Sequence, residues 1–393
     1  NYRGTPAEID GNDFSGSANG LHINAANPGA GNDFIMTWQG SLGPNKNTFG
    51  NHTNQALQLS NLHYFDVSGW DMPTLYTDPS TKNGLSLEAV NNSRFANNDL
   101  SGMAVGVYVR GSSSNTVITD NDMSNCGTAF HTYVHNGPNA NLWTVTNNDM
   151  TNSNGNAMDY IGRPQEISGN DFTGSNGGIS FRSANNYTLD AGSNTWALAD
   201  AATGIFVEYT SGLTINNLTL TGDGGTGIYA RNGINNLVVD NLASCGKSVA
   251  VQIQSGSGHI VRNSNFGTAG TAVYLAGTGG AQILDNNFYN VGTEVQDNGS
   301  NTTISGSQTV INDPWCPAPP NEIPVADAGQ DQSLPSAGVL TTVYLDGSGS
   351  SDADVTDVLT YSWAWSGGSA SGATPTVSLP TGMHSITLTV DDQ

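Results

Sequence analysis

Residues 98–123 read NDLSGMAVGVYVRGSSSNTVITDNDM, and this stretch holds one full period of a repeat that runs through most of the chain. The period opens on a short phrase of Asn, a second polar residue and an apolar residue. Five clear copies of this Asn phrase occur, at Asn98-Asp99-Leu100, Asn121-Asp122-Met123, Asn148-Asp149-Met150, Asn170-Asp171-Phe172 and Asn194-Thr195-Trp196. Their Asn residues are 23, 27, 22 and 24 positions apart. Such regular spacing is typical of an architecture built by stacking similar units.

Each period also contains a small residue followed by a segment in which apolar and polar residues alternate, as they do in β-strands. Examples are residues 106–110, 178–182, 204–208 and 227–231. Helical periodicity is absent. Asn and Gly, which tolerate the left-handed backbone conformation of sharp corners, occur every few residues. Several short strands with corners between them predict one coil of an all-β solenoid, whose core forms only when coils stack.

This pattern resembles the right-handed parallel β-helix superfamily, the architecture of pectate-lyase-like proteins, over roughly residues 8–310. The resemblance implies a parallel β-helix of about a dozen coils in residues 1–312. Residues 1–11 are too few to form a cap over the first coil, so we expect the native protein to extend upstream. The fold does not identify an activity, because it is found in lyases, hydrolases, epimerases, adhesins and phage tailspikes.

A second domain is predicted after a Pro-rich linker of residues 313–323. Composition changes there, because no Asn follows Asn321. Residues 324–393 contain the phrases PVADAG (324–329), VYLDGSGSSD (343–352), LTYSW (359–363) and ITLTVDD (386–392). In this order the phrases resemble a PKD domain, a small immunoglobulin-like β-sandwich common in secreted and surface proteins. Alternating strands and a Trp independently predict a C-terminal β-sandwich.

Composition limits the partners of the chain. Lys and Arg total 10 against 33 Asp and Glu, which gives a formal net charge of −23. Such a surface repels phosphate backbones, so no nucleic acid partner is expected. No apolar run approaches the roughly 20 residues of a membrane-spanning helix, so no membrane insertion is expected either. The acidic, Lys-poor composition indicates an extracellular or cell-surface setting.

Alternation along the strands also predicts which side chains point outward. Because stacked coils lie about 4.8 Å apart, the outward residues of successive coils form columns. The first column contains Tyr108, His131, Asp159, Ser180, Phe206, Tyr229 and, further on, Tyr274. The second column contains Arg110, Tyr133, Ile161, Arg182, Glu208, Arg231 and Gln254. We call the surface formed by these two columns the outer face.

The outer face carries residue types that polysaccharide cleavage requires. His131 beside Asp159 is an imidazole held by a carboxylate, and Tyr133 is a second group that could transfer a proton. β-Elimination needs such a base together with a cation, for example Arg182, to neutralise the substrate carboxylate. Hydrolysis is the alternative, because Asp159 and Glu208 lie two coils apart, about 9.6 Å. The candidate catalytic residues are His131, Tyr133, Asp159, Arg182 and Glu208.

Substrate binding is predicted for the same two columns. Arginines bind carboxylate or sulfate groups of acidic sugars, and aromatic rings can stack on sugar rings. The candidate binding residues are Tyr108, Arg110, Phe206, Tyr229, Arg231 and Tyr274. A second interpretation stays open, in which these arginines, Glu208 and the rings form ladders that only stabilise the sheet.

A calcium site is predicted in the tail domain. Asp346, Asp352, Asp354 and Asp391 offer the oxygen ligands that Ca²⁺ prefers, and solvated turn carboxylates are the alternative. The cysteines predict no disulfide framework. Cys126 and Cys245 lie roughly five coils apart, beyond disulfide reach, and are interpreted as small buried side chains.

Two functions follow from these observations. The first is an extracellular polysaccharide-binding β-helix that cleaves an acidic polysaccharide on its outer face, as a polysaccharide lyase or a glycoside hydrolase. The second is a non-enzymatic structural or adhesive surface protein, in which the solenoid is a stiff rod that self-associates into fibres. The tail domain would then link rods. The residues of the outer face favour the first function, and the lack of a complete catalytic signature favours the second.

Overall fold

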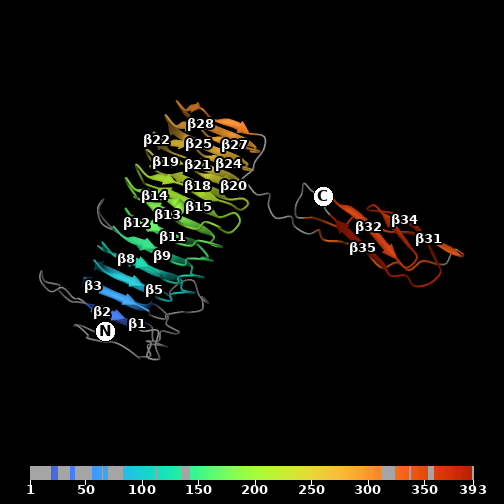
Figure 1. Cartoon of the computed structure of the whole chain (residues 1–393), viewed down its shortest axis with the longest axis horizontal. Helices are drawn as coiled ribbons and strands as arrows, with labels where there is room; N and C mark the ends of the chain where they lie inside the picture. Colours follow the sequence, from blue (N-terminus) through green and yellow to red (C-terminus); the bar gives the residue numbers. More distant parts are fainter. Residues whose placement is uncertain are drawn as a thin grey trace. The chain divides into compact units, whose positions relative to one another are not determined.

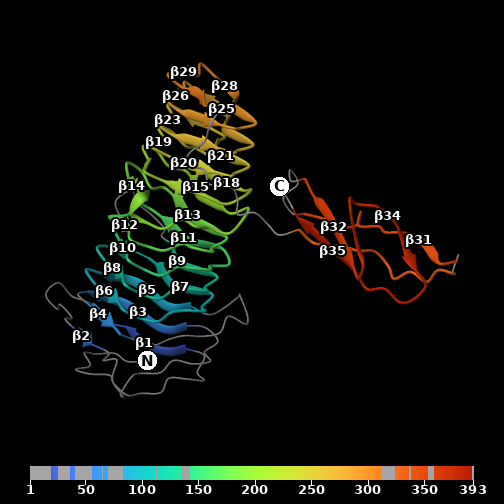
Figure 2. The same ribbon diagram turned by 45° about the vertical axis from the view of Figure 1, so that its right-hand side comes forward.

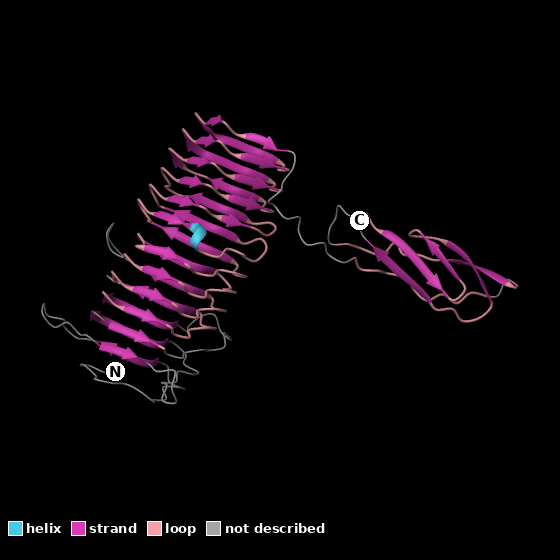
Figure 3. Cartoon of the chain, viewed as in Figure 1, coloured by secondary structure: helices cyan, strands magenta, loops and turns pink. Residues whose placement is uncertain are grey.

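The computed structural model describes residues 19–24, 36–39, 55–63, 65–69, 83–111, 113–133, 142–310, 324–335, 338–352 and 358–391. The chain divides into two compact units, Asn1–Cys316 and Pro317–Gln393. The domain bounds 1–312, 313–323 and 324–393 stay predictions, because residues 311–323 lie outside the described residues. Strands make up nearly all the regular structure of the described residues, whose only helix is the short 3₁₀-helix η1 (Ala191–Ser193), drawn in cyan in Figure 3.

One wall of the first unit is a 13-stranded parallel sheet (Figure 1). Each of its strands except β22 (Gly256–Ser257) comes from a different coil. The others are β1 (Asn19–Asn24), β3 (Gln55–His63), β5 (Asn83–Asn91), β7 (Val105–Arg110), β9 (Thr128–Tyr133), β11 (Asn156–Ile161), β13 (Gly177–Arg182), β15 (Thr203–Glu208), β18 (Thr226–Arg231), β21 (Val249–Ile253), β25 (Thr271–Gly279) and β28 (Thr293–Ser300). Residues about two dozen positions apart in the sequence therefore lie side by side in space, as the repeat predicts.

The second wall consists of two parallel sheets of six strands each (Figure 2). The first contains β2 (Met36–Gln39), β4 (Phe65–Ser68), β6 (Arg94–Ala96), β8 (Val117–Thr119), β10 (Thr144–Thr146) and β12 (Glu166–Ser168). The other contains β14 (Thr188–Asp190), β16 (Thr214–Asn216), β19 (Val238–Asp240), β23 (Ile260–Arg262), β26 (Gln282–Leu284) and β29 (Thr303–Ser305). This arrangement confirms the predicted all-β parallel solenoid.

The third wall changes character along the solenoid. At its start, single-residue parallel bridges join Asp99, Asp122, Asp149, Asp171 and Thr195 in turn. Further on, a five-stranded parallel sheet takes over. Its strands are β17 (Thr219–Leu220), β20 (Ala243–Cys245), β24 (Asn265–Gly267), β27 (Asn287–Tyr289) and β30 (Gln308–Val310).

The Asn of each Asn phrase forms an internal ladder at the corner before this third wall. Asn121 donates through Nδ2 to Oδ1 of Asn148 at 2.9 Å, and Asn148 donates likewise to Asn170 at 2.9 Å. These amides are almost fully buried. Elsewhere at corners, most non-glycine residues with positive φ are also Asn, as at Asn97 with φ 54° and Asn241 with φ 55°. The abundance of Asn is therefore explained by the ladder and the corners.

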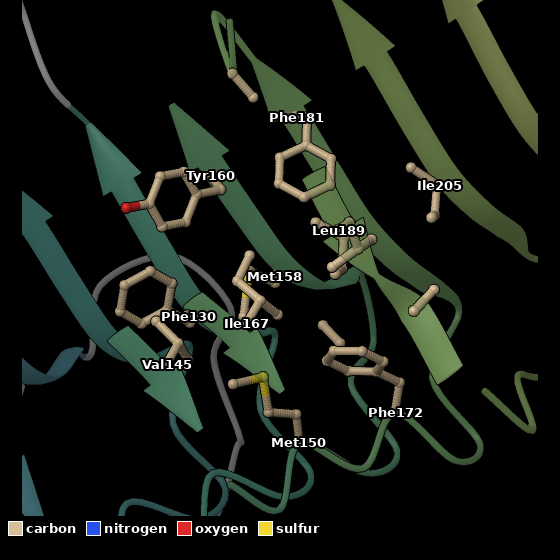
Figure 4. Close-up of a cluster of buried hydrophobic side chains, with 14 of the residues drawn as sticks. Phe130, Val145, Met150, Met158, Tyr160, Ile167, Phe172, Phe181, Leu189 and Ile205 are labelled. Atoms are coloured by element: carbon tan, nitrogen blue, oxygen red, sulfur yellow. The ribbon is translucent and has the colours of Figure 1, made fainter. Parts of the chain in front are cut away.

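The core lies between the walls as one continuous apolar cluster. Figure 4 shows Phe130, Tyr160 and Phe181 of the 13-stranded sheet facing side chains of the second wall, with Met150 and Phe172 below them. The rings of Phe130 and Tyr160 stack with centroids 6.0 Å apart. Because each coil supplies only one layer of this cluster, burial depends on the coils above and below.

The second unit consists of two small antiparallel sheets. One pairs β31 (Leu340–Tyr344) with β34 (Thr376–Pro380), and the other contains β33 (Gly368–Ser371), β32 (Thr360–Trp365) and β35 (Ile386–Asp391). Trp363 is buried in its core and donates through Nε1 to the Gly372 carbonyl at 3.0 Å. These sheets are compatible with a β-sandwich, and the PKD identity stays a prediction.

The cysteines differ from each other. Cys126 is free and buried, and burial raises the pKa of its thiol to about 12. Cys245 is buried but disulfide-bonded, so its interpretation as an unbonded buried side chain is wrong. The expectation that the cysteines form no disulfide framework therefore does not hold for Cys245, and Cys316 lies outside the described residues. Among those residues, no helix is both long and apolar enough to cross a membrane.

Candidate functional site

The outer face is the solvent side of the 13-stranded sheet, and its first column follows the predicted order. Pairing of parallel strands places Tyr108 beside His131, His131 beside Asp159 and Asp159 beside Ser180. The column continues through Phe206 and Tyr229. Gln252 then lies between Tyr229 and Tyr274, a position that the sequence reading had left unassigned.

The second column is also in register over most of its length. Arg110 pairs with Tyr133, Arg182 follows Ile161, and Glu208 lies between Arg182 and Arg231. Tyr133 is 45% exposed, which makes it the most accessible candidate proton-transfer group on the outer face. The alternation of inward apolar and outward polar residues therefore assigns the columns correctly.

His131 and Asp159 form the predicted imidazole–carboxylate pair. Nδ1 of His131 lies 3.1 Å from Oδ2 of Asp159, and both side chains are largely covered. The ring of Tyr108 stacks on the imidazole at a centroid distance of 5.3 Å. Because Nδ1 faces the carboxylate, Nε2 is the nitrogen left for proton transfer.

The charge state of Asp159 suits this role. Burial by itself would raise the pKa of the carboxyl group, but His131, Ser180 and Arg182 stabilise the charged form and together hold the pKa below its usual range. The carboxylate therefore stays ionised at neutral pH. An ionised partner fixes the orientation of the imidazole.

Glu208 is held by three donors. Its Oε1 lies 2.9 Å from Nε of Arg231 and 2.8 Å from Nδ2 of Asn232, and its Oε2 lies 3.3 Å from Nε of Arg182. The Glu208 side chain is 8% exposed, whereas both guanidinium groups are nearly half exposed. Both carboxylate oxygens are engaged, so Glu208 is built into the sheet as a bridge between neighbouring coils.

Aromatic rings flank this bridge. The guanidinium carbon of Arg231 lies 5.0 Å from the centroid of the Phe206 ring and 5.5 Å from that of Tyr229. The two rings contact each other edge to face at 5.5 Å. The Tyr229 hydroxyl donates to Oε1 of Gln254 at 2.9 Å. The outer face thus has two aromatic stations, Tyr108–His131 and Phe206–Tyr229, with Asp159 and Ser180 on the coils between them.

Glu88 completes the charge pattern and was missed by the sequence reading. Its Oε2 lies 3.1 Å from a terminal nitrogen of Arg110, the register partner on the next coil. The segment Gly84-Leu85-Ser86-Leu87-Glu88 has the same glycine-led alternation as residues 106–110. That signal would have placed Glu88 at the start of the second column.

The candidate calcium ligands are not brought together among the described residues. Asp346 accepts hydrogen bonds from both the backbone nitrogen and the hydroxyl of Ser348, which lowers the pKa of its carboxyl group. No group of three or more His, Cys, Asp or Glu side chains in the described part of the chain is arranged to hold a metal ion. Asp354 lies outside that part. Calcium binding by Asp346, Asp352, Asp354 and Asp391 stays a prediction.

Comparison with known proteins supports the solenoid. Residues 132–287 and 193–314 match the family model for a right-handed β-helix region. No curated protein matches the chain.

Three solved structures are similar to this chain at low identity. The lacto-N-biosidase of family GH136 from Eubacterium ramulus is 9% identical with a TM-score of 0.34, covering 65% of this chain and 51% of that protein. The Dettilon tailspike protein is 11% identical with a TM-score of 0.33, covering 85% and 69%. The GH87 α-1,3-glucanase from Streptomyces thermodiastaticus is 12% identical with a TM-score of 0.25, covering 79% and 63%. The chain thus spans about half of the first of these proteins, and similarities of this size concern the fold alone.

Proposed function

We propose that this protein binds a polysaccharide along its outer face. The observation that carries the proposal is the pair of aromatic stations, Tyr108–His131 and Phe206–Tyr229, in register on one solvent-facing wall. Rings of this kind offer large, rigid apolar surfaces, while hydroxyl and amide groups beside them supply hydrogen bonds. An extracellular or cell-surface setting, suggested by composition, is part of the proposal.

The glycan would lie across the strands, parallel to the solenoid axis. Strands of a sheet lie about 4.8 Å apart, so a chain crossing them meets a new outward side chain at each coil. The stations are separated by the coils that carry Asp159 and Ser180. A glycan long enough to contact both stations would therefore pass directly over the His131–Asp159 pair.

The proposal also includes cleavage of the bound polysaccharide, with His131 as the catalytic group. An imidazole oriented by an ionised carboxylate can accept a proton at Nε2 and return it to a leaving oxygen. Glu208 is a poor second carboxylate for hydrolysis because both its oxygens are engaged. Tyr133, exposed on the coil of His131, is the remaining candidate partner for proton transfer.

Binding is tested with single aromatic substitutions. Tyr108→Ala and Tyr229→Ala remove one ring from each station, and each is expected to weaken glycan binding about 3- to 10-fold. Affinity electrophoresis through gels that contain individual polysaccharides measures the effect. Tyr344→Ala, which removes an exposed Tyr of the second unit, is the matched control and should bind like the parent. Equal mobility of all four proteins in every gel would contradict the proposal.

Cleavage is tested separately on any polysaccharide that binds. Reducing ends report hydrolysis, and the absorbance of an unsaturated product reports elimination. His131→Asn should abolish turnover and weaken binding by no more than about 3-fold, because the proposed proton transfer is lost while the Tyr108 ring and the Phe206–Tyr229 station stay. Turnover that survives this substitution would remove His131 from the mechanism without affecting the binding proposal.

A rod without enzymatic activity is the second candidate. It is favoured by the contacts that join successive coils on the outer face, above all the Arg182–Glu208–Arg231 bridge, which stabilises the sheet whether or not a glycan binds. Electron microscopy of the purified protein would show ordered fibres if this candidate holds, and glycan gels would show no retardation.

A further inference from the structure

The charges of the outer face cancel each other. Between β5 and β25 its two columns carry the carboxylates of Glu88, Asp159 and Glu208 and the guanidinium groups of Arg110, Arg182 and Arg231. With His131 neutral, the face has no net charge, although the chain as a whole has a formal net charge of −23. The outer face is thus a locally neutral strip on a strongly acidic protein.

Each guanidinium group of the strip already contacts a carboxylate of the same strip. Arg110 pairs with Glu88, while Arg182 and Arg231 share Glu208. In this bridge two guanidinium groups share one carboxylate, which leaves one positive charge in excess. The guanidinium group of Arg231, however, also lies against the rings of Phe206 and Tyr229. A ligand carboxylate would have to compete with Glu88, or with a Glu208 whose two oxygens are both bonded.

Resting on the proposed function, we infer that the polysaccharide bound by this face is a neutral one. A uronate polymer brings a negative charge with each sugar, and the acidic protein repels it before contact. At physiological ionic strength this repulsion is screened over about 8 Å, so it weakens but does not vanish for a ligand lying on the surface. A neutral glycan meets no such barrier and can still contact the aromatic rings and Gln252.

The experiment uses polymers that differ only in charge. De-esterified polygalacturonate and its fully methyl-esterified form share one backbone, and carboxylated and unmodified cellulose make a second pair. Neutral glucans, galactans and mannans widen the panel. Binding of the full chain is measured at low and high salt. The neutral member of a bound pair is expected to bind at least about 10-fold tighter at low salt, and the gap should narrow as salt rises.

A pair of variants makes the test specific to the strip. Glu88→Gln releases Arg110 at an exposed ion pair, so the protein should fold normally and gain affinity for the acidic polymer while its affinity for the neutral one stays within about 2-fold. Glu166→Gln removes the same charge from the exposed β12 on another wall and should leave the neutral-to-acidic ratio at the parent value.

The outcomes separate the two claims. Tighter binding of the acidic polymer at low salt, weakening as salt rises, would overturn the neutral-ligand inference and leave polysaccharide binding intact. A response of Glu166→Gln equal to that of Glu88→Gln would overturn the assignment to the strip. Failure of every polymer to bind would sink the proposed function, and the inference with it.

Discussion

The two halves of the solenoid make the same corner in different ways. In the first half a buried Asn precedes each single-residue bridge of the third wall, and its amide donates to the amide on the next coil. In the second half the residue before each third-wall strand is Leu218, Leu242, Ser264, Asn286 or Ser307 in turn. Leu218 and Leu242 are fully buried and cannot form a polar ladder.

This difference shows that the hydrogen bonds joining successive coils at a corner can come mainly from side chains or mainly from the backbone. Where only one residue per coil bridges to the next, the buried amides supply the missing hydrogen bonds. Where β17, β20 and β24 form a continuous sheet, backbone pairing joins the coils beside the two apolar corners, and the Leu242 backbone nitrogen donates to the Ser264 hydroxyl on the next coil at 3.1 Å. Buried polar groups need partners, and either source satisfies the requirement.

The largest loss of stability is expected when a buried Asn of the first-half corner is replaced by Leu, the residue found at the second-half corner. Asn148→Leu leaves the backbone nitrogen and Nδ2 of Asn121 without their shared acceptor, and it also removes the bonds to the Ile118 and Thr146 carbonyls. The expected loss is about 4 kcal/mol of unfolding free energy, from several unpaired buried groups. Urea unfolding measures it. Asn154→Ala, at an exposed position of the same coil, should change stability by less than about 0.5 kcal/mol.

If Asn148→Leu loses less than about 1 kcal/mol of unfolding free energy, the corners of the two halves are interchangeable and the buried amides are not needed in the first half.

The second-largest loss of stability is expected at the apolar corner of the second half. Leu242→Ala removes a fully buried side chain and leaves a cavity, with an expected cost of about 3 kcal/mol. The corner makes no amide ladder there, so Leu242→Met, which conserves volume, should lose less than about 1.5 kcal/mol. Similar losses for both variants would indicate that shape rather than burial controls this corner.

A smaller effect is expected on the outer face. Glu208→Gln removes the charge that Arg182 and Arg231 share, but both guanidinium groups are nearly half exposed and can turn to water. The expected loss is about 1–2 kcal/mol, against less than about 0.5 kcal/mol for Glu88→Gln, whose ion pair is exposed on both sides. Thermal unfolding at low and high salt checks the order of the two variants.

The smallest effect is a pH dependence confined to the second half. Burial lowers the pKa of His259 below its ordinary value of 6.5, only partly opposed by the hydrogen bond to the Ser255 carbonyl. Its Nδ1 accepts from the Leu237 backbone nitrogen, which requires the neutral ring. Its contribution to stability is therefore complete above about pH 6.5 and is lost as the pH falls through the lowered pKa. Melting temperatures from pH 8 to pH 4.5 should fall less steeply for His259→Gln than for the parent.

The fold could be predicted from the sequence because a repeat determines which residues lie on adjacent coils. A spacing of 27 positions between Asn121 and Asn148 places these side chains on adjacent coils, whatever the details of the loops. Strand alternation then gives the inward or outward direction of each side chain, so both columns could be assigned, with Glu88 and Gln252 recoverable from the same pattern.

The partners of those side chains could not be derived in the same way. Alternation shows that Arg182 and Arg231 point outward, but not that both turn toward Glu208 rather than toward a ligand. That choice depends on side-chain rotamers and on distances of a few ångströms across coils. The bond at Cys245 was missed as well, because strand alternation and coil spacing do not indicate whether a buried cysteine is bonded.

Since each coil rests only on the two beside it, a whole coil can be removed without changing how the remaining coils pack. Removing residues 149–170 would join Asn148 to Asp171 and recreate an intact Asn-Asp-Phe junction. Strand β9 would then lie beside β13, and His131 would face Ser180 where it now faces Asp159. Loss of a module would thus preserve the scaffold while rewriting the order of groups along its surface, which makes the solenoid easy to vary by duplication and deletion.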